Sequence, residues 1–469
     1  DSLETRTRDQ LISIVKEGVE FLEDFVASKE TVKIDTSALD DKATIWLALG
    51  DRPFIVDSVL ECFRAHDLLI DIYLHPILTL QDGRKVSLTY IELDQLSDER
   101  LHVVRKVLLT SLQDLVLATE DYSSILARIE TLIRVTDRTV NTGGFTQHEL
   151  GEARDFLRWL SSDNFIFLGY AHWQTSESDQ ILLPPSKTLG ICRSSGSGSA
   201  TLITESSQDA QRIVEQEQFI KIDRLRVEAT VHHRVRMYSI TVRETAPDGT
   251  LSGVHSFAGL LTSRALSEPA ERVPLLRSKV QKILDLENAP PNSYDRKNIV
   301  SVIDSMPKDE VLRLTVSELR EEVRKVLGIQ QKSDTRVSLR ADDSGRGVSI
   351  AIVLPRERFS SAVRHKLQDF IESELNAIPG SSEYSLSLSS KPLARMHFYV
   401  PVSELSGLSI EISRLKLQIV ELTRSWQDNL RDRILQTEEF SDTAHIVHKF
   451  RDAFPDEYQA THSVDECIE

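Results

Sequence analysis

Hydrophobic spacing in residues 1–135 predicts one amphipathic helix followed by one small α/β module. Leu11, Val15, Leu22 and Phe25 recur at helical spacing, so we expect an N-terminal helix with these side chains on its apolar face. Residues 43–49 form a short apolar run that suits a buried strand. A helix, two strands around an Asp-Gly hairpin signal and a helix from residue 97 follow. The order β-α-β-β-α supplies five of the six elements of a ferredoxin-like plait.

Residues 146–265 have a different pattern, in which one helix precedes several strand-like segments. The expected strands are residues 165–174, 180–183, 189–192, 220–231, 237–244 and 255–262. The run of serine and glycine at residues 194–199 is expected to be a flexible loop. A mostly antiparallel sheet with few helices predicts a sensor-like domain of the PAS type.

The last part of the chain is predicted to form a second small α/β module. It follows a helical connector with proline breaks at residues 290–291 and 307. Strands are expected at residues 336–340 and 348–354, then a helix, then strands at 384–388 and 396–400. A long helix from Leu408 to Trp426 closes the unit, and its apolar spacing continues beyond Trp426. This second plait, β-β-α-β-β-α, implies a regulatory array or an internal duplication. The predicted fold class is α+β and multidomain.

Composition limits the kinds of molecule that this chain is expected to bind and the compartment in which it is expected to occur. The chain has 73 acidic and 56 basic residues, a formal net charge of −17, which disfavours nucleic acid and anionic membrane surfaces. Three widely spaced cysteines allow no disulfide framework, so we expect a reducing, cytoplasmic compartment. Residue 1 is Asp rather than Met and the sequence ends after a polar run, so both ends are expected to be cut from a longer protein.

Four ordered groups of residues carry a family resemblance. Residues 51–59 read Asp-Arg-Pro-Phe-Ile-Val-Asp-Ser-Val, and residues 74–78 read Leu-His-Pro-Ile-Leu. The other groups are residues 156–160 with 165–170, residues 257–263 with 273–280, and residues 352–359 with 423–426. In this order and spacing they resemble the large bacterial NAD-dependent glutamate dehydrogenases, whose N-terminal half carries ACT-like and PAS-like modules.

The resemblance implies a function for the whole protein and a regulatory place for this chain. In that family the full-length enzyme converts L-glutamate, NAD and water to 2-oxoglutarate, ammonium and NADH, and its dehydrogenase domain lies towards the C-terminus. No catalytic residue can be assigned here, because the catalytic lysine and aspartate motifs of that family have no counterpart in this sequence. No NAD-binding residue can be assigned either, because the closest glycine-rich segment, residues 196–201, lacks a third glycine. The fragment alone is therefore expected to be inactive and to bind no cofactor. Its expected partners are its own C-terminal catalytic domain, further copies of itself and an amino-acid effector.

One turn is the candidate effector site. Gly50, Asp51, Arg52 and Pro53 join a strand to a helix, where backbone N–H groups could hold a carboxylate and Arg52 could add a bidentate contact. The alternative interpretation is that Asp51 caps the helix, Pro53 occupies its first turn and Arg52 is a surface charge.

The histidines do not predict a metal site. His75 is expected to be structural, and His232 and His233 would point to opposite faces of a strand. His445 and His448 share a helical face near Asp442, but zinc requires three or four good ligands. Ser58 and Ser256 lack the sequence context of a hydrolase nucleophile.

The expected organisation assigns six segments. They are an N-terminal helix (1–40), an ACT-like domain (41–135), a PAS-like domain (146–265), a helical connector (266–332), a second ACT-like domain (333–430) and a tail (431–469). The alternative function is a stand-alone ACT-domain amino-acid sensor or interaction scaffold. A metal-dependent hydrolase using the scattered histidines is a third, weaker hypothesis.

Overall fold

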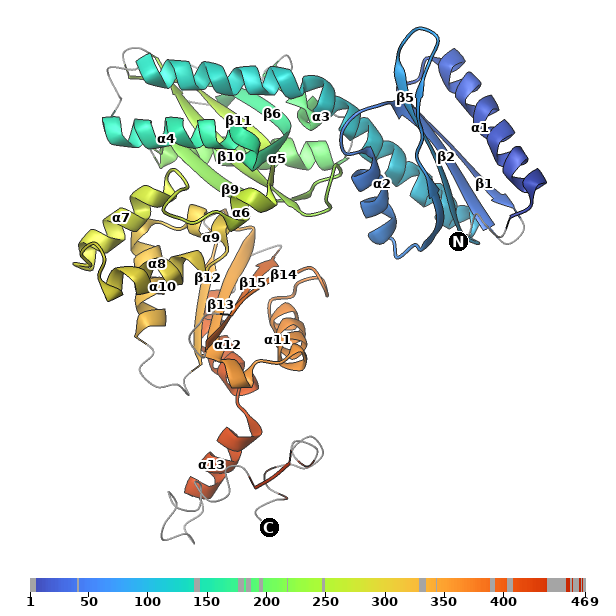
Figure 1. Ribbon diagram of the computed structural model, residues 1–469. Helices are drawn as coiled ribbons and strands as arrows, with labels where there is room; N and C mark the ends of the chain where they lie inside the picture. The colour runs from blue at the N-terminus through green and yellow to red at the C-terminus, as the bar shows by residue number, and fades with distance from the viewer. Residues whose placement is uncertain are drawn as a thin grey trace. The chain divides into compact units, whose positions relative to one another are not determined.

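The structure is a computed structural model with two compact units, residues 1–278 and 279–469 (Figure 1). It describes residues 6–39, 42–138, 144–175, 181–182, 187–193, 197–216, 218–246, 249–328, 335–342, 344–388, 393–402 and 408–436, together with 453–455, 458, 464 and 466. Within the described residues, no helix is both long and apolar enough to cross a membrane.

The first unit opens with the predicted α/β module plus one strand that the sequence did not predict. Its elements are β1 (Val32–Leu39), β2 (Lys42–Gly50), α2 (Ile55–Arg64), β3 (Ile70–Leu74), β4 (Ile77–Thr79), β5 (Lys85–Asp94) and α3 (Asp98–Arg138). The sheet is antiparallel in the order β1-β2-β5-β3, and β4 pairs with β5. The predicted β-α-β-β-α order is confirmed, and β1 takes the edge beside β2.

The N-terminal helix α1 (Arg8–Ser28) is confirmed, and so is its predicted apolar face at Leu22 and Phe25, but the face is wrong at Leu11 and Val15. Leu11 and Val15 are exposed, whereas the buried side is formed by Ile14, Gly18, Phe21 and Phe25. Phe21 and Phe25 pack on β2 and β5, on the face of the sheet opposite α2 and α3 (Figure 1). A β-carbon at Gly18 would lie 2.7 Å from the ring of Trp46 on β2, so glycine permits this close approach.

A second antiparallel sheet completes the first unit. It comprises β6 (Phe165–Thr175), β7 (Ile181–Leu182), β8 (Thr188–Gly190), β9 (Ile220–Glu228), β10 (Arg236–Thr245) and β11 (Leu251–Leu261). The order is β7-β6-β11-β10-β9, and β8 pairs with β6. All six predicted strands are present, although β8 and β9 end earlier than predicted.

Three helices pack on this sheet. α4 (Gln147–Trp159) lies beside the second half of α3, which continues past the first sheet to reach β6 and β8 (Figure 1). α5 (Ser197–Glu215) packs Ala210 and Ile213 against Trp173 and Val254 on the sheet. The prediction of a loop at residues 194–199 is wrong for residues 197–199, which begin α5. Residues 194–196 lie outside the described part.

The second unit combines four helices with a second plait. The helices are α7 (Leu276–Leu286, which spans the unit boundary), α8 (Tyr294–Asp304), α9 (Lys308–Arg313) and α10 (Val316–Leu327). The plait consists of β12 (Arg336–Ala341), β13 (Gly347–Pro355), α11 (Ser361–Glu374), β14 (Glu383–Leu388), β15 (Leu393–Pro401) and α12 (Leu408–Leu422), followed by α13 (Trp426–Gln436). The predicted connector helices and β-β-α-β-β-α order are confirmed.

Both plaits have one topology. The second sheet runs β12-β13-β15-β14, all antiparallel, as the first runs β1-β2-β5-β3. In each, two strands, a helix, further strands and a second helix follow in sequence; the further strands are β3, β4 and β5 in the first plait and β14 and β15 in the second. The confirmed class is therefore α+β with antiparallel sheets, and it includes a repeated plait.

Candidate functional site

The arginine of the predicted turn is directed against the protein. Arg52 Nε donates to the carbonyl oxygen of Gly50 at 3.0 Å, and its guanidinium group donates to Thr119 Oγ1 at 3.1 Å on α3. Burial lowers the pKa of Arg52, and the Glu120 carboxylate, 3.9 Å away, acts in the opposite direction. Arg52 thus joins the turn to α3, and a ligand carboxylate would compete with contacts that the side chain already makes.

α2 begins without the cap that the sequence predicted. Phe54, with φ of 68°, precedes Ile55 as the N-cap, and it makes no side-chain hydrogen bond to the helix. Pro53 lies before the helix rather than in its first turn. The Asp51 N–H donates to the carbonyl oxygen of Lys85 at 3.0 Å, which ties the turn to β5. The left-handed Phe54 delays the start of the helix, so Asp51 is too early in the chain to cap it.

The turn borders a cavity of about 350 Å³. Pro53 and Phe54 form one side of it, and apolar residues of β6 form another. Its polar lining residues include Tyr122, Asp163 and Thr262. Small-ligand sites are commonly apolar cavities with few polar groups, so a ligand at this turn would occupy the cavity as well as the turn itself.

A larger cavity of about 610 Å³ lies between α2, α3 and residues 227–237 of the same unit. Its wall is rich in polar groups, among them Glu61, Lys106, Asp114, His232 and His233. Cys62 and Ser58 also line it, but burial raises the pKa of the Cys62 thiol to about 11. Ser58 Oγ accepts a hydrogen bond from the His232 N–H at 2.9 Å. A protonated thiol and a hydroxyl engaged by an amide suit binding better than nucleophilic catalysis.

The histidine pair in this wall does not have the predicted arrangement. His232 Nδ1 lies 3.0 Å from Asp57 Oδ2, and His233 Nδ1 lies 3.8 Å from Glu61 Oε1, so both rings face α2. Their ring centroids are 3.9 Å apart. The predicted opposite orientation is wrong because β9 ends at Glu228 and His232 has φ of 70°, which turns the chain.

Three strands of the second sheet assemble a cluster that sequence reasoning missed. His172 on β6 is the cross-strand partner of His255 on β11, and Glu244 lies on β10. Glu244 Oε2 is 3.0 Å from His172 Nε2 and 3.4 Å from His255 Nε2. Tyr170 Oη lies 2.8 Å from His255 Nδ1. The residues are far apart in the chain, so only strand register brings them together.

The cluster has the residue types of a metal site but a different geometry. The hydrogen bond to His172 and the nearby imidazole of His255 hold the pKa of Glu244 well below its usual range, and burial lowers the pKa of His255. Among the described residues, this is the group whose ligand atoms gather within 4.8 Å. The two imidazole rings are stacked 4.2 Å apart at 8°. Because a metal binds in the plane of each imidazole, parallel rings do not direct their nitrogens to one ion.

Of the remaining histidines considered in the sequence, His75 makes a structural contact and the other two lie outside the described residues. His75 Nδ1 lies 2.7 Å from Thr89 Oγ1, and burial lowers the pKa of its ring. Ser256 is buried on β11. His445, His448 and Asp442 lie outside the described residues.

Comparisons with known proteins agree on one family. The profile of the glutamate dehydrogenase ACT2 domain matches residues 336–427, and that of glutamate dehydrogenase helical motif 1 matches residues 273–332. Curated relatives named NAD-specific glutamate dehydrogenase include that of Halomonas elongata (25% identity, 87% of this chain, 27% of the relative). Those of Pseudomonas aeruginosa and Mycobacterium tuberculosis are each 24% identical and cover 87% and 70% of this chain, and 26% and 20% of the relatives.

A solved structure, PelD 158-CT from Pseudomonas aeruginosa, matches with 11% identity and a TM-score of 0.15, covering 64% of this chain and 84% of that chain. The chain spans about a quarter of the length of the first two curated relatives. The matches over most of this chain show that it is similar to the NAD-specific glutamate dehydrogenases, and residues 273–332 and 336–427 match the helical motif 1 and ACT2 domain of glutamate dehydrogenase.

Proposed function

We propose that this chain is the regulatory and oligomer-building part of an NAD-dependent glutamate dehydrogenase. The observation that carries the proposal is the similarity over 87% of this chain to only 27% of a relative. The whole protein would oxidise L-glutamate with NAD and water to 2-oxoglutarate, ammonium and NADH. The chemistry would reside in a catalytic domain outside these residues.

The repeated plaits and the second sheet are suited to sensing and assembly. Two plaits of one topology offer duplicated surfaces, and the cavities of about 350 and 610 Å³ offer space for small ligands. We assign the second sheet to a PAS-type sensor. The proposed partners are the catalytic domain, further copies of the chain and an amino-acid effector in the cytoplasm.

A pair of assays tests the proposed division of labour. Full-length protein should form NADH from NAD and L-glutamate, whereas the 469-residue chain should not. A full-length protein without this activity would reject the dehydrogenase assignment. A natural protein that ends near residue 469 and still binds amino acids would instead favour the stand-alone sensor.

The turn at Gly50, Asp51, Arg52 and Pro53 remains our proposed effector site. Calorimetric titration of the chain with the common amino acids should reveal a ligand whose affinity falls about tenfold or more in Arg52→Ala, because one charge-assisted contact contributes about 1.5–3 kcal/mol. Arg64→Ala is the matched control, since Arg64 is exposed at the other end of α2. Equal affinity in both variants would exclude Arg52 from binding.

A further inference from the structure

The sheet of the second plait has one apolar face and one polar face. Ile350 and Ile352 on β13, and Phe398 on β15, belong to the core that includes α11 and α12. Strand alternation places Ser349, Arg395 and the other odd-numbered residues of β13 and β15 on the opposite face. The helical segment α8 to α10 contacts this polar face through side chains, so it covers Ser349 and Arg395, whereas Arg336 and Ser385 at its edges stay exposed.

At one end of this polar face, a carboxylate balances the positive charge of the arginines. Glu310 on α9 forms ion pairs with Arg313 and Arg340 and accepts a hydrogen bond from Ser349 Oγ at 2.9 Å. Its side chain is only 4% exposed. Buried charges are normally paired in this way, because a buried charge loses its hydration and needs an ion pair or hydrogen bonds to offset that cost.

At the other end, Arg395 has no such carboxylate. It is 9% exposed, and its guanidinium group donates to Oγ of Ser305, the residue that caps the C-terminus of α8, while Nε is buried without a partner. Among the described residues, no acidic side chain forms an ion pair with it. Burial lowers the pKa of Arg395 without an opposing contribution from a nearby negative charge, which is consistent with an uncompensated cation.

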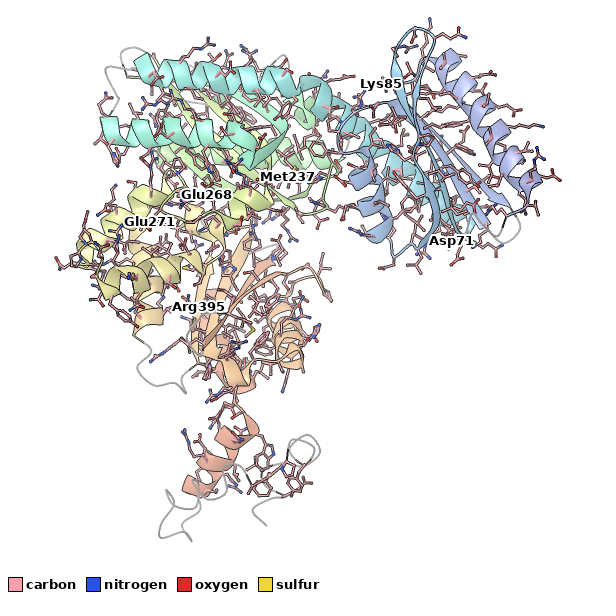
Figure 2. The ribbon with its side chains drawn as sticks, in the orientation of Figure 1. Asp71, Lys85, Met237, Glu268, Glu271 and Arg395 are labelled. Carbon is pink, nitrogen blue, oxygen red and sulfur yellow. The ribbon has the colours of Figure 1, made fainter. Side chains whose placement is uncertain are left out.

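Arg395 lines a cavity of about 270 Å³ within the second unit (Arg395 is labelled in Figure 2). Ser305 and Ser385 add hydroxyl groups, and Val302, Met306 and Val353 contribute apolar wall. The acidic lining residue Glu322 already pairs with Lys325 at 2.7 Å. The cavity therefore combines an unmatched positive charge with an apolar body, and its volume is below the roughly 300–1,000 Å³ typical of drug-sized ligands.

We propose that this cavity binds a small carboxylic acid with a short apolar chain, whose carboxylate pairs with Arg395. The carboxylate would supply the counter-charge that Glu310 supplies at the other end of the face, through the planar fork of donors that arginine offers. The hydroxyl groups would complete its hydrogen bonds, and the apolar wall would select the chain. Amino acids and 2-oxo acids with apolar side chains belong to this class. Binding here is independent of the proposed dehydrogenase function and of the turn at residues 50–53.

Calorimetry on the 469-residue chain tests the proposal with 4-methylpentanoate, 4-methylpentan-1-ol, acetate and inorganic phosphate. The expected result is that 4-methylpentanoate binds at least tenfold more tightly than the alcohol, which lacks the charge, and than acetate, which lacks the chain. Phosphate as the tightest ligand would overturn the carboxylate class and indicate a simple anion site. Absence of binding by every probe would overturn the site.

Three variants locate the bound carboxylate. Arg395→Met should weaken 4-methylpentanoate at least tenfold, and Arg356→Gln, which alters an exposed arginine beyond β13, should leave it unchanged. Arg395→Met should also melt at the same or a higher temperature without ligand, because it removes an uncompensated buried charge. A purely structural Arg395 would instead lower the melting temperature and leave any binding intact. Ala351→Leu fills the cavity without altering a charge and should abolish binding, which keeps the test decisive if Arg395→Met does not fold.

Discussion

Glu310 is a buried carboxylate whose neighbours determine both its charge and its contribution to stability. Burial alone would raise its pKa, but the guanidinium groups of Arg313 and Arg340, with His397, hold the pKa well below its usual range. Glu310→Gln should therefore lower the local free energy of unfolding by about 3–5 kcal/mol at pH 7, because Arg340 loses its buried counter-charge and Arg313 keeps only Asp342. Hydrogen exchange at β13 and β15 measures this change.

The same carboxylate predicts a pH dependence with a definite sign. A depressed pKa stabilises the fold above the unfolded value, roughly pH 4.3, and this stabilisation is lost as pH falls towards the folded pKa. Glu310→Gln should therefore lose less stability than the wild type on acidification below about pH 4. Glu357→Gln is the control, since Glu357 is exposed on the turn after β13. Parallel pH profiles for wild type and Glu310→Gln would contradict the assignment.

His255 should act over a higher pH range. Burial lowers the pKa of its ring, so the unfolded chain binds a proton more readily below about pH 6.5. The free energy of unfolding of the first unit should fall as pH drops from 7.5 to 5.5, and His255→Gln should remove part of that slope. Urea unfolding at several pH values measures it. A steeper slope in the variant would show that the ring is stabilised in its charged form.

Gly259 on β11 has no side chain, and this allows β11 to pair closely with β6. A β-carbon at Gly259 would lie 2.0 Å from the carbonyl oxygen of Ile166, at a register shift between these strands. Gly259→Ala should destabilise the first unit by about 1–3 kcal/mol or more, because backbone must move. Gly151→Ala in α4 has its nearest contact at 3.8 Å and should instead stabilise by up to about 1 kcal/mol. Thermal melts of both variants should shift in opposite directions.

Elements with strong periodicity were predictable, and those set by local chemistry were not. β2 has an uninterrupted apolar core, whereas the first half of β1 alternates Val32 and Ile34 with polar residues, and β1 is defined by its pairing with β2. The expected single helix from Leu408 past Trp426 is wrong, because it divides into α12 and α13. Ser425 causes the division: its Oγ accepts from the Asp428 N–H at 3.1 Å and starts a new helix.

The candidate sites depend on tertiary contacts that cannot be predicted from the sequence. The turn at residues 50–53 was identified from local sequence, but the destination of Arg52 on α3 depends on tertiary packing. The pairing of Glu310 with Arg340 and the lack of a counter-charge for Arg395 arise only when α8 to α10 cover the second plait. The packing of these helices on the plait thus determines that Arg340 is paired with a carboxylate and that Arg395 is left able to bind a ligand.

The two units have separate cores, so they should unfold in separable steps. Leu112 is fully buried in the core shared by the two sheets of the first unit, and Ile371 is fully buried in the core of the second plait. Leu112→Ala and Ile371→Ala should each cost about 2–5 kcal/mol through the cavity left behind. Scanning calorimetry of the full chain should show two transitions, with each variant lowering a different one. A single transition that both substitutions shift equally would mean that the units unfold as one cooperative structure.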